Sequence, residues 1–240
     1  MAARGYGQDS GLATAVERVG ERWALLVVRD LLVGPRRYTD LRRGLPRIPT
    51  NILAARLKEL QEAGVVRRVP LMNCGLVYEL TPYGRALEPV VLALERWGLE
   101  APGAPQPEGG DAVSADALTM TLRSLFRPEV AASVPDADYE LHLDPVVLRV
   151  RVEGDALRIA QLAPSAPPVG GRMPEGEPDV ALALASVAAL RGLASGALTP
   201  ADALDEGVAR ILRGEGTLIE RFAATFRLAP GQASRPSGER

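Results

Sequence analysis

The 240-residue chain has few of the residues that build disulfides, metal centres and redox sites. It contains one cysteine, Cys74, and one histidine, His142. A single cysteine excludes an internal disulfide framework and any site built from several cysteines. An isolated histidine in a strand-like run is typical of a packed or surface residue. We therefore expect neither a metal nor a cofactor.

Long apolar runs and catalytic signatures are also missing. No apolar stretch reaches the roughly 20 residues needed to cross a bilayer, and the start, MAARGYGQDS, lacks the apolar core of a signal peptide. These absences predict a cytoplasmic protein with no membrane partner. The chain has no nucleophile elbow, no phosphate loop and no pair of carboxylates in a plausible catalytic frame, and residues 214–216 are typical of a plain turn before a helix. An enzyme is not expected.

Positive charge gathers in one short segment of a slightly acidic chain. The formal net charge is −2, yet residues 36–68 contain nine Arg or Lys side chains and only three acids. Such a local excess is the electrostatic footprint of nucleic-acid binding. For any single arginine an ordinary solvated surface is the simpler interpretation. The charge excess indicates DNA binding only in combination with the helix pair and the ribbon predicted in the same segment.

The spacing of residues 49–63 predicts an amphipathic helix. Three leucines recur at i, i+4 and i+7, namely Leu53, Leu57 and Leu60. The opposite face carries small and polar side chains, namely Asn51, Ala54, Ala55 and Lys58. Such a face can lie deep in the major groove, with Asn51 toward an adenine and Lys58 toward a phosphate or guanine. Pro49 suits the start of the helix and Gly64 its left-handed cap.

A shorter helix precedes this one and a two-stranded ribbon follows it. The shorter helix begins near Thr39 as the N-cap. The β-rich runs VVRRVPL and LVYELT flank Met-Asn-Cys-Gly, a hairpin loop. On the ribbon, Arg67 and Arg68 would contact the DNA backbone. The predicted DNA-contacting residues are Arg36, Arg37, Thr39, Arg42, Arg43, Thr50, Asn51, Ala54, Ala55, Lys58, Arg67 and Arg68.

Residues from about Ser10 to Leu99 resemble the HxlR-type winged helix family of bacterial transcription regulators. The motifs that carry the resemblance are VGERWALLVVRDLLV, GPRRYTDLRRGLP and VYELTPYGRALE. The resemblance implies a homodimer, joined largely through the first and last helices of this region, on an inverted-repeat operator of double-stranded DNA. Ser10 stands where many members have a cysteine, through which some sense thiol-reactive species. Pro49-Thr50 replaces the family's frequent Ser-Pro pair.

Composition and charge divide the chain into two predicted domains. Residues 1–100 form the DNA-binding and dimerisation domain, and residues 114–229 form the second domain. Residues 101–113 form a Pro/Gly-rich linker and residues 230–240 a disordered tail. Residues 1–100 carry a net charge of +4, whereas the remainder carries −6. The acidic second domain is therefore not expected to add DNA contacts.

The second domain mixes helix and strand signals, which predicts an α+β fold. Ser114 is a candidate N-cap for a helix with an apolar face over residues 118–126. The runs DYELHLD, VVLRVRVEG and DALRIAQL alternate with period two, and the last two join as a hairpin at residues 153–155. A further strand, DVALALA, leads into helices, a short strand and the closing helix TLIERFAATFRL.

The last strands and helices, PDVALALASVAALRGLASGALTPADALDEGVARILRGEGTLIERFAATF, resemble the sterol carrier protein type 2-like fold. The resemblance implies helices over one face of a mostly antiparallel sheet, with an apolar tunnel for a hydrophobic small molecule. The expected lining residues are Leu148, Val150, Leu182, Leu184, Val187, Leu190, Leu212, Phe222 and Phe226. The same residues would also suit a filled core. Trp23 and Trp97 fall in the helices expected to pair across the dimer, where packing explains them better than ligand stacking.

Three functional interpretations follow from these patterns. The leading one is a dimeric DNA-binding regulator whose second domain binds a hydrophobic effector. The alternative is a constitutive DNA-binding regulator in which the second domain is a structural or oligomerisation module. A third interpretation, a lipid-binding or transfer protein whose winged helix contacts other proteins, leaves the basic segment unexplained.

Overall fold

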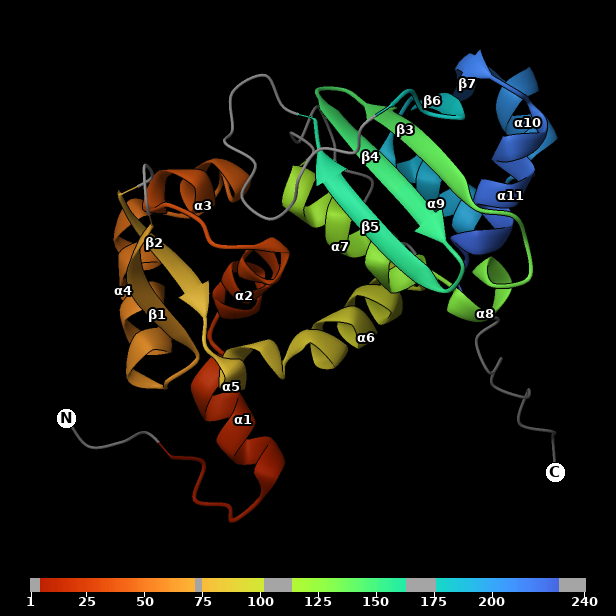
Figure 1. Cartoon of the computed structure of the whole chain (residues 1–240). Coiled ribbons are helices and arrows are strands. Elements are labelled where there is room, and N and C mark those ends of the chain that lie inside the picture. Colours follow the sequence, from red (N-terminus) through yellow and green to blue (C-terminus); the bar gives the residue numbers. More distant parts are fainter. Residues whose placement is uncertain (1–4, 72–74, 102–113, 163–175, 229–240) are drawn as a thin grey trace, which may run out of the picture. The chain divides into compact units, whose positions relative to one another are not determined.

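The computed structural model describes the chain in four stretches, residues 5–71, 75–101, 114–162 and 176–228. Within them, one compact unit comprises residues 5–71, 75–94 and 114–120, and a second comprises residues 95–101, 121–162 and 176–228. We describe each unit by itself (Figure 1). Cys74, nearly all of the predicted linker and the predicted tail lie outside the described residues.

The first unit combines helices with a β-hairpin. Its elements are α1 (Gly11–Val19), α2 (Ala24–Val33), α3 (Tyr38–Gly44), α4 (Thr50–Glu62), β1 (Val66–Leu71), β2 (Gly75–Leu80), α5 (Pro82–Arg85) and the larger part of α6 (Glu88–Leu99). The first residues of α7 (Ala115–Leu125) also belong to it. The predicted pair of helices and the ribbon that follows them are confirmed as α3, α4 and the antiparallel β1–β2 hairpin.

The ends of α3 and α4 show which predicted helix caps are correct. Gly64 has a φ of +71°, which confirms the left-handed cap after α4. The predicted N-cap at Thr39 is wrong, because α3 begins at Tyr38 and Arg37 is its N-cap. The Asp40 carboxylate accepts a hydrogen bond from the Arg37 backbone N–H (3.1 Å). This capping contact places Thr39 inside the first turn.

The core of the first unit lies between α2, α3, α4 and the hairpin. Leu31, Leu41, Leu53, Leu57 and Leu60 are almost completely buried in it. Met120 of α7 is buried in the same cluster, although residues 114–120 fall within the predicted second domain. The apolar stripe of α4 is thus confirmed as its core face, which leaves the opposite face for other contacts.

Asp30 is a carboxylate buried in this unit. It is 0% exposed, and its Oδ1 accepts hydrogen bonds from Arg29 at 2.9 and 2.7 Å. Its Oδ2 has no hydrogen-bond partner among the described residues, and a Cβ added at Gly44 would lie 2.9 Å from it. Burial raises the pKa of Asp30 to about 6, although Arg29 opposes the shift.

The second unit is a five-stranded sheet with helices. Its elements are the ends of α6 and α7, α8 (Pro128–Ala131), β3 (Ala137–Leu143), β4 (Val146–Glu153), β5 (Ala156–Gln161), β6 (Val180–Leu184), α9 (Val187–Ser195), α10 (Pro200–Asp205), β7 (Ala209–Gly214) and α11 (Thr217–Thr225). The strand order is β5-β4-β3-β6-β7, and only the β3–β6 pair is parallel. Helices α9 and α11 lie over one face of the sheet (Figure 1). A mostly antiparallel α+β unit is therefore confirmed.

Aromatic rings fill part of the space between the sheet and the helices. The ring centroids of Phe222 and Phe226 lie 4.7 Å apart, Tyr139 lies 5.3 Å from Phe222, and Phe126 lies 5.8 Å from Phe226. These separations are those of packed aromatic pairs. Two of the residues expected to line a tunnel, Phe222 and Phe226, therefore pack against each other.

The other residues expected to line a tunnel differ in how far their side chains are buried. Most are buried, namely Leu148, Val150, Leu182, Leu184 and Leu190, and Val187 is half-buried. The prediction for Leu212 is wrong, because its side chain is 51% exposed on β7. The β6–β7 pairing shifts register here, because Arg213 pairs with Ala181 whereas Ile211 pairs with Leu182. Leu212 lies between these two pairs as the extra residue of a β-bulge on an edge strand, where the regular alternation of side chains is interrupted.

Two further features concern the described residues only. His142 lies on β3 with its Nε2 atom 2.7 Å from Glu140, and no cluster of three or more potential metal ligands occurs in these stretches. None of the helices seen there is both long and apolar enough to cross a membrane.

Asp30 should make folding stability depend on pH. Its folded-state pKa of about 6 exceeds the ordinary value of 3.8, so the folded state binds more protons between about pH 4 and 6. The contribution of Asp30 to stability therefore falls as pH rises through this window, by at most about 3 kcal/mol. We expect Asp30→Asn to gain stability relative to wild type as pH rises from 4 to 6, measured by urea unfolding.

The control for this measurement is Asp205→Asn, which changes an exposed carboxylate in α10. Its stability difference from wild type should stay nearly constant over the same pH range. A constant difference for Asp30→Asn as well would contradict the assignment of the raised pKa to Asp30.

Candidate nucleic-acid interface

The outer face of α4 lies opposite its three core leucines. Asn51, Ala54 and Lys58 are exposed and Ala55 is half-buried, so the predicted face is turned to solvent. Lys58 is 78% exposed and its Nζ lies 3.7 Å from Glu62, a weak surface pair one helical turn away. This face therefore offers a small, polar surface with one long cationic side chain.

The N-terminal end of α4 is not capped by a side chain. Pro49 is the N-cap, it makes no side-chain capping bond, and the first turn contains no acidic residue. The Tyr38 hydroxyl donates a hydrogen bond to the Thr50 carbonyl oxygen (2.9 Å), which joins α3 to α4. Thr50 itself is exposed. Unbonded amides and the helix dipole make such an end favourable for an anion.

Helix α3 brings further cations to the same substructure. Thr39, Arg42 and Arg43 are exposed, and Arg37 is half-buried at the N-cap. Arg42 and Arg43 occupy the last turn of α3, where positive side chains also complement the helix dipole. These arginines can contact phosphates without rearrangement of the core.

The hairpin carries two arginines at adjacent positions of β1. Both are exposed, and Arg67 donates to Glu79 on β2, with its Nη2 2.6 Å from the carboxylate. The Arg68 guanidinium lies 5.7 Å from the centroid of the Tyr78 ring. One arginine is therefore partly neutralised across the hairpin, whereas the other is held over an aromatic face.

Arg36 does not belong to this surface, and its predicted role in DNA contact is wrong. It is 8% exposed, and its Nε and Nη2 atoms donate to the two oxygens of Asp116 at 2.9 and 2.6 Å. Burial lowers the pKa of the Arg36 guanidinium, but the hydrogen bonds and charge of Asp116 outweigh this and raise it. The positive charge of Arg36 is therefore neutralised by Asp116 inside the protein and is not available to DNA.

Arg36 also ties this ion pair to the hairpin. Its backbone N–H donates to the Tyr78 carbonyl (2.9 Å), and the Tyr78 N–H donates back to the Arg36 carbonyl (2.8 Å). Asp116 lies in the first turn of α7 and is itself buried. No spacing signal joins two residues 80 positions apart, so Asp116 was missed from the sequence.

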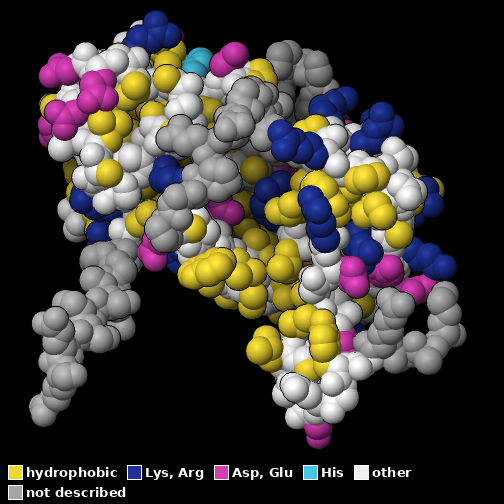
Figure 2. Space-filling view, turned by 180° about the vertical axis from the view of Figure 1, so that it is seen from behind, with side chains coloured by type: hydrophobic (Ala, Val, Ile, Leu, Met, Phe, Trp, Pro, Cys, Tyr) yellow, Lys and Arg dark blue, Asp and Glu magenta, His cyan; other side chains and the backbone are white. Residues whose placement is uncertain are grey.

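Some large hydrophobic side chains are exposed on α1, and others on α6, which is divided between the two units. Leu12 and Val16 on α1 are 76% and 37% exposed, and Val90, Leu94 and Trp97 on α6 are between 43% and 73% exposed. Figure 2 shows that hydrophobic side chains are exposed on the face opposite to the view of Figure 1. Ser10 begins α1 as its N-cap, where its hydroxyl accepts a hydrogen bond from the Ala13 N–H (3.1 Å).

Comparisons with known proteins match this part of the chain. A family model described as HxlR-like helix-turn-helix matches residues 18–104. The chain is 36% identical over 88 residues to the uncharacterized HTH-type transcriptional regulator YvaP of Bacillus subtilis, covering 36% of this chain and 82% of that protein. It is 39% identical over 104 residues to the regulator Mb3122 of Mycobacterium bovis, covering 42% of this chain and 64% of that protein.

A solved structure is similar to part of this chain. The reduced form of the transcriptional regulator YodB from B. subtilis is 32% identical and has a TM-score of 0.33. The match covers 41% of this chain and 93% of that chain.

The Arg36–Asp116 pair gives a prediction about folding stability. Asp116→Ala would leave the Arg36 charge buried without its partner, so we expect a loss of about 3–5 kcal/mol in the free energy of unfolding. Asp155→Ala, at an exposed turn position, should change it by less than about 0.5 kcal/mol. The double variant Arg36→Met/Asp116→Leu should recover most of the loss, measured by urea unfolding. Equal stability of Asp116→Ala and Asp155→Ala would refute the role of the pair.

Proposed function

The chain belongs to the HxlR family of helix-turn-helix transcriptional regulators, and we propose that it binds an inverted-repeat operator as a homodimer. In this proposal α4 is the recognition helix and lies in the major groove of each half-site. The observation that carries the proposal is the outer face of α4, where exposed Asn51, Ala54 and Lys58 stand opposite a fully buried leucine stripe. Small residues allow close approach of the helix, and Asn51 can bond an adenine bidentately.

Phosphate contacts surround this helix in the proposal. Thr39, Arg42 and Arg43 of α3 and Arg67 and Arg68 of β1 are exposed and polar or cationic, which suits contacts to the DNA backbone. Arg37, Thr50 and Ala55 complete the proposed surface. Arg36 is left out, because its guanidinium is bonded to Asp116.

The proposed dimer buries the exposed hydrophobic side chains of α1 and α6. Leu12 in the first unit and Trp97 in the second are each more than two-thirds exposed, and a large exposed apolar side chain is a candidate for burial against a partner surface. A twofold dimer matches the symmetry of an inverted repeat and doubles the base contacts.

Two roles for the second unit follow from different observations. The helix layer over a mostly antiparallel sheet supports the predicted sterol-carrier-like site for a hydrophobic effector, lined by the predicted residues other than Leu212. The packed rings of Tyr139, Phe222 and Phe226 and the placement of Asp116 in the first unit favour the alternative, a structural module. The hydrophobic effector stays a prediction.

Substitutions on α4 test the proposed DNA contacts. With a duplex selected from random sequences by binding to this protein, Asn51→Ala should weaken specific binding by about 1–3 kcal/mol and leave binding to random duplex nearly unchanged. Lys58→Ala should weaken both and lower the slope of log K against log salt by about one. Fluorescence anisotropy at several salt concentrations measures both effects.

Gln61→Ala is the matched control, because it removes an exposed amide from the far end of the same helix. It should bind both duplexes like wild type. If Asn51→Ala keeps full sequence preference, α4 does not present this face to the bases and the proposal fails.

The dimer is tested by introducing charge on its proposed surface. Leu12→Glu and Trp97→Glu should shift sedimentation velocity profiles from dimer to monomer and weaken operator binding, because a buried unpaired carboxylate opposes association. Leu212→Glu is the control, since Leu212 is also an exposed leucine but lies on β7. A dimer that survives both α1 and α6 substitutions would place the interface elsewhere.

A further inference from the structure

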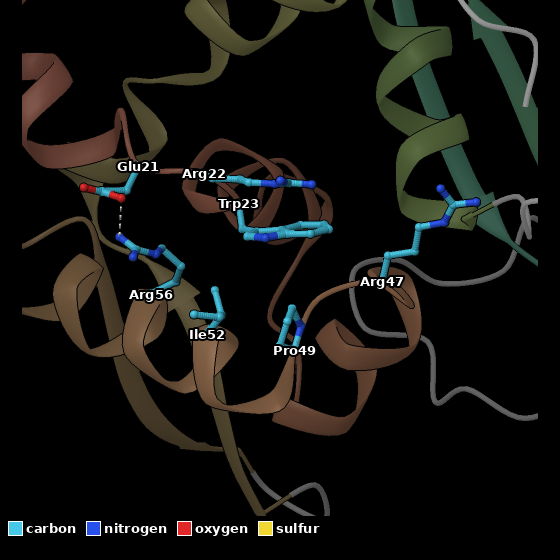
Figure 3. Close-up of a pocket in the computed structure, with 7 residues that line it drawn as sticks. All are labelled: Glu21, Arg22, Trp23, Arg47, Pro49, Ile52 and Arg56. Carbon is cyan, nitrogen blue, oxygen red and sulfur yellow. Dashed lines mark ion pairs between the residues drawn. The ribbon is translucent and has the colours of Figure 1, made fainter.

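A cavity opens beside the start of α4, on the flank between its core face and its outer face. Its volume is about 400 Å3, and it is lined by Glu21, Arg22, Trp23, Arg47, Pro49, Ile52 and Arg56 (Figure 3). All of these residues belong to the first unit. The volume falls within the range of small-molecule sites, which is roughly 300–1,000 Å3.

Trp23 supplies a flat apolar wall to this cavity. The Arg22 guanidinium lies 5.2 Å from the centroid of the indole ring, on the side away from Ile52 and Pro49 in Figure 3. The other side of the ring faces Ile52 and Pro49 across the cavity. Two apolar side chains opposite an indole form a slot suited to a planar, apolar ligand.

The backbone of Trp23 is strained in the conformation that holds its ring there. Its φ is +79°, the only left-handed conformation of a non-glycine residue among the described residues. An L-residue with a bulky side chain rarely adopts this conformation, and such strain persists at sites where the surrounding structure enforces it, often binding sites.

Arg56 supplies a cation with an unused donor. Its side chain is only 13% exposed, and it forms ion pairs with Glu21, at 3.6 Å, and with Glu59. Its Nε is buried and has no hydrogen-bond partner among the described residues. A buried donor without an acceptor is unfavourable. The Arg56 side chain as a whole lines the cavity (Figure 3), where a carboxylate oxygen can accept a charge-assisted hydrogen bond from its guanidinium.

We propose that this cavity binds a planar aromatic carboxylate of about two fused rings. The rings lie between Trp23 and the pair Pro49 and Ile52, and the carboxylate accepts from Arg56. The charge of the lining, three arginines and one glutamate, favours an anion. A DNA phosphate would also use the arginines but has no need of the indole wall. The proposal does not depend on DNA binding.

The indole N–H resonances of the protein test this site directly. The full chain has two tryptophans, so 15N-labelled protein gives two indole resonances, which Trp97→Phe assigns. Titration with 2-naphthoate should move the Trp23 resonance saturably, because a stacked ring shifts nearby protons, and leave the Trp97 resonance in place. Equal movement of both resonances, or no movement, would overturn the proposal.

Three other ligands each lack one feature that the proposed site recognises. The neutral 2-naphthamide lacks the charge, decahydro-2-naphthoate lacks the aromatic plane, and inorganic phosphate lacks the apolar body. Each should bind at least about tenfold more weakly than 2-naphthoate. Phosphate binding as tight as that of 2-naphthoate would assign the cavity to a phosphate group and overturn the proposal.

Variants of the cavity complete the test. Arg56→Gln should weaken 2-naphthoate binding about tenfold or more, and Arg56→Lys should restore part of the affinity. Glu21→Gln removes an anion that competes for Arg56, so binding should tighten by about two- to fivefold. Arg85→Gln is the matched control, because Arg85 is an exposed arginine of α5 outside the cavity, and it should bind like wild type.

The thermal midpoint of each variant shows whether it is folded. If Arg56→Gln fails to fold, the other two variants still test the role of Arg56. Arg56→Lys should bind 2-naphthoate more weakly than wild type, and Glu21→Gln should bind it more tightly. Unchanged affinity in a folded Arg56→Gln variant, or weaker binding in Glu21→Gln, would refute the role of Arg56.

Discussion

The buried ion pair between Arg36 and Asp116 connects the parts of the first unit that the chain order separates. Arg36 lies just before α3, is paired through its backbone with Tyr78 of the hairpin, and is bonded through its side chain to α7. A buried charge is tolerated only while its partner is present. The position of the hairpin relative to α3 and α4 therefore depends on a residue from beyond residue 100.

This pair and two other sets of ion pairs explain why the uncompensated positive charge of residues 36–68 is smaller at the surface than in the sequence. Arg36 is neutralised internally, Arg67 bonds to Glu79, and Arg56 is held by Glu21 and Glu59. The exposed cations of this segment lie on α3, at Arg47, on the outer face of α4 and on β1, where Arg67 is partly neutralised by Glu79. In the proposed complex, these exposed cations lie on the surface that contacts the DNA backbone.

Local patterns predicted most of the fold, whereas long-range partners escaped prediction. The leucine stripe of α4, the left-handed Gly64 and the alternating strands of the second unit each depend on neighbouring residues, and the structure confirms them. The error at the N-cap of α3 is itself local, but two other errors have a different origin. Arg36 is buried by a residue 80 positions away, and Leu212 is the extra residue where the pairing of β6 with β7 shifts register. Neither fact is encoded in a window of ten or twenty residues.

The long-range contacts also set an order of events while the protein is being synthesised. The core of the first unit is complete once Met120 has emerged from the ribosome, but the second unit needs the contact of Phe126 with Phe226, roughly 100 residues later. At about 5–20 residues per second this delay lasts roughly 5–20 seconds. Residues 115–120 of α7 belong to the first unit, whereas the helix from Thr121 onward belongs to the second. A nascent chain thus carries all the residues of the helix-turn-helix unit before the residues of the second unit are complete.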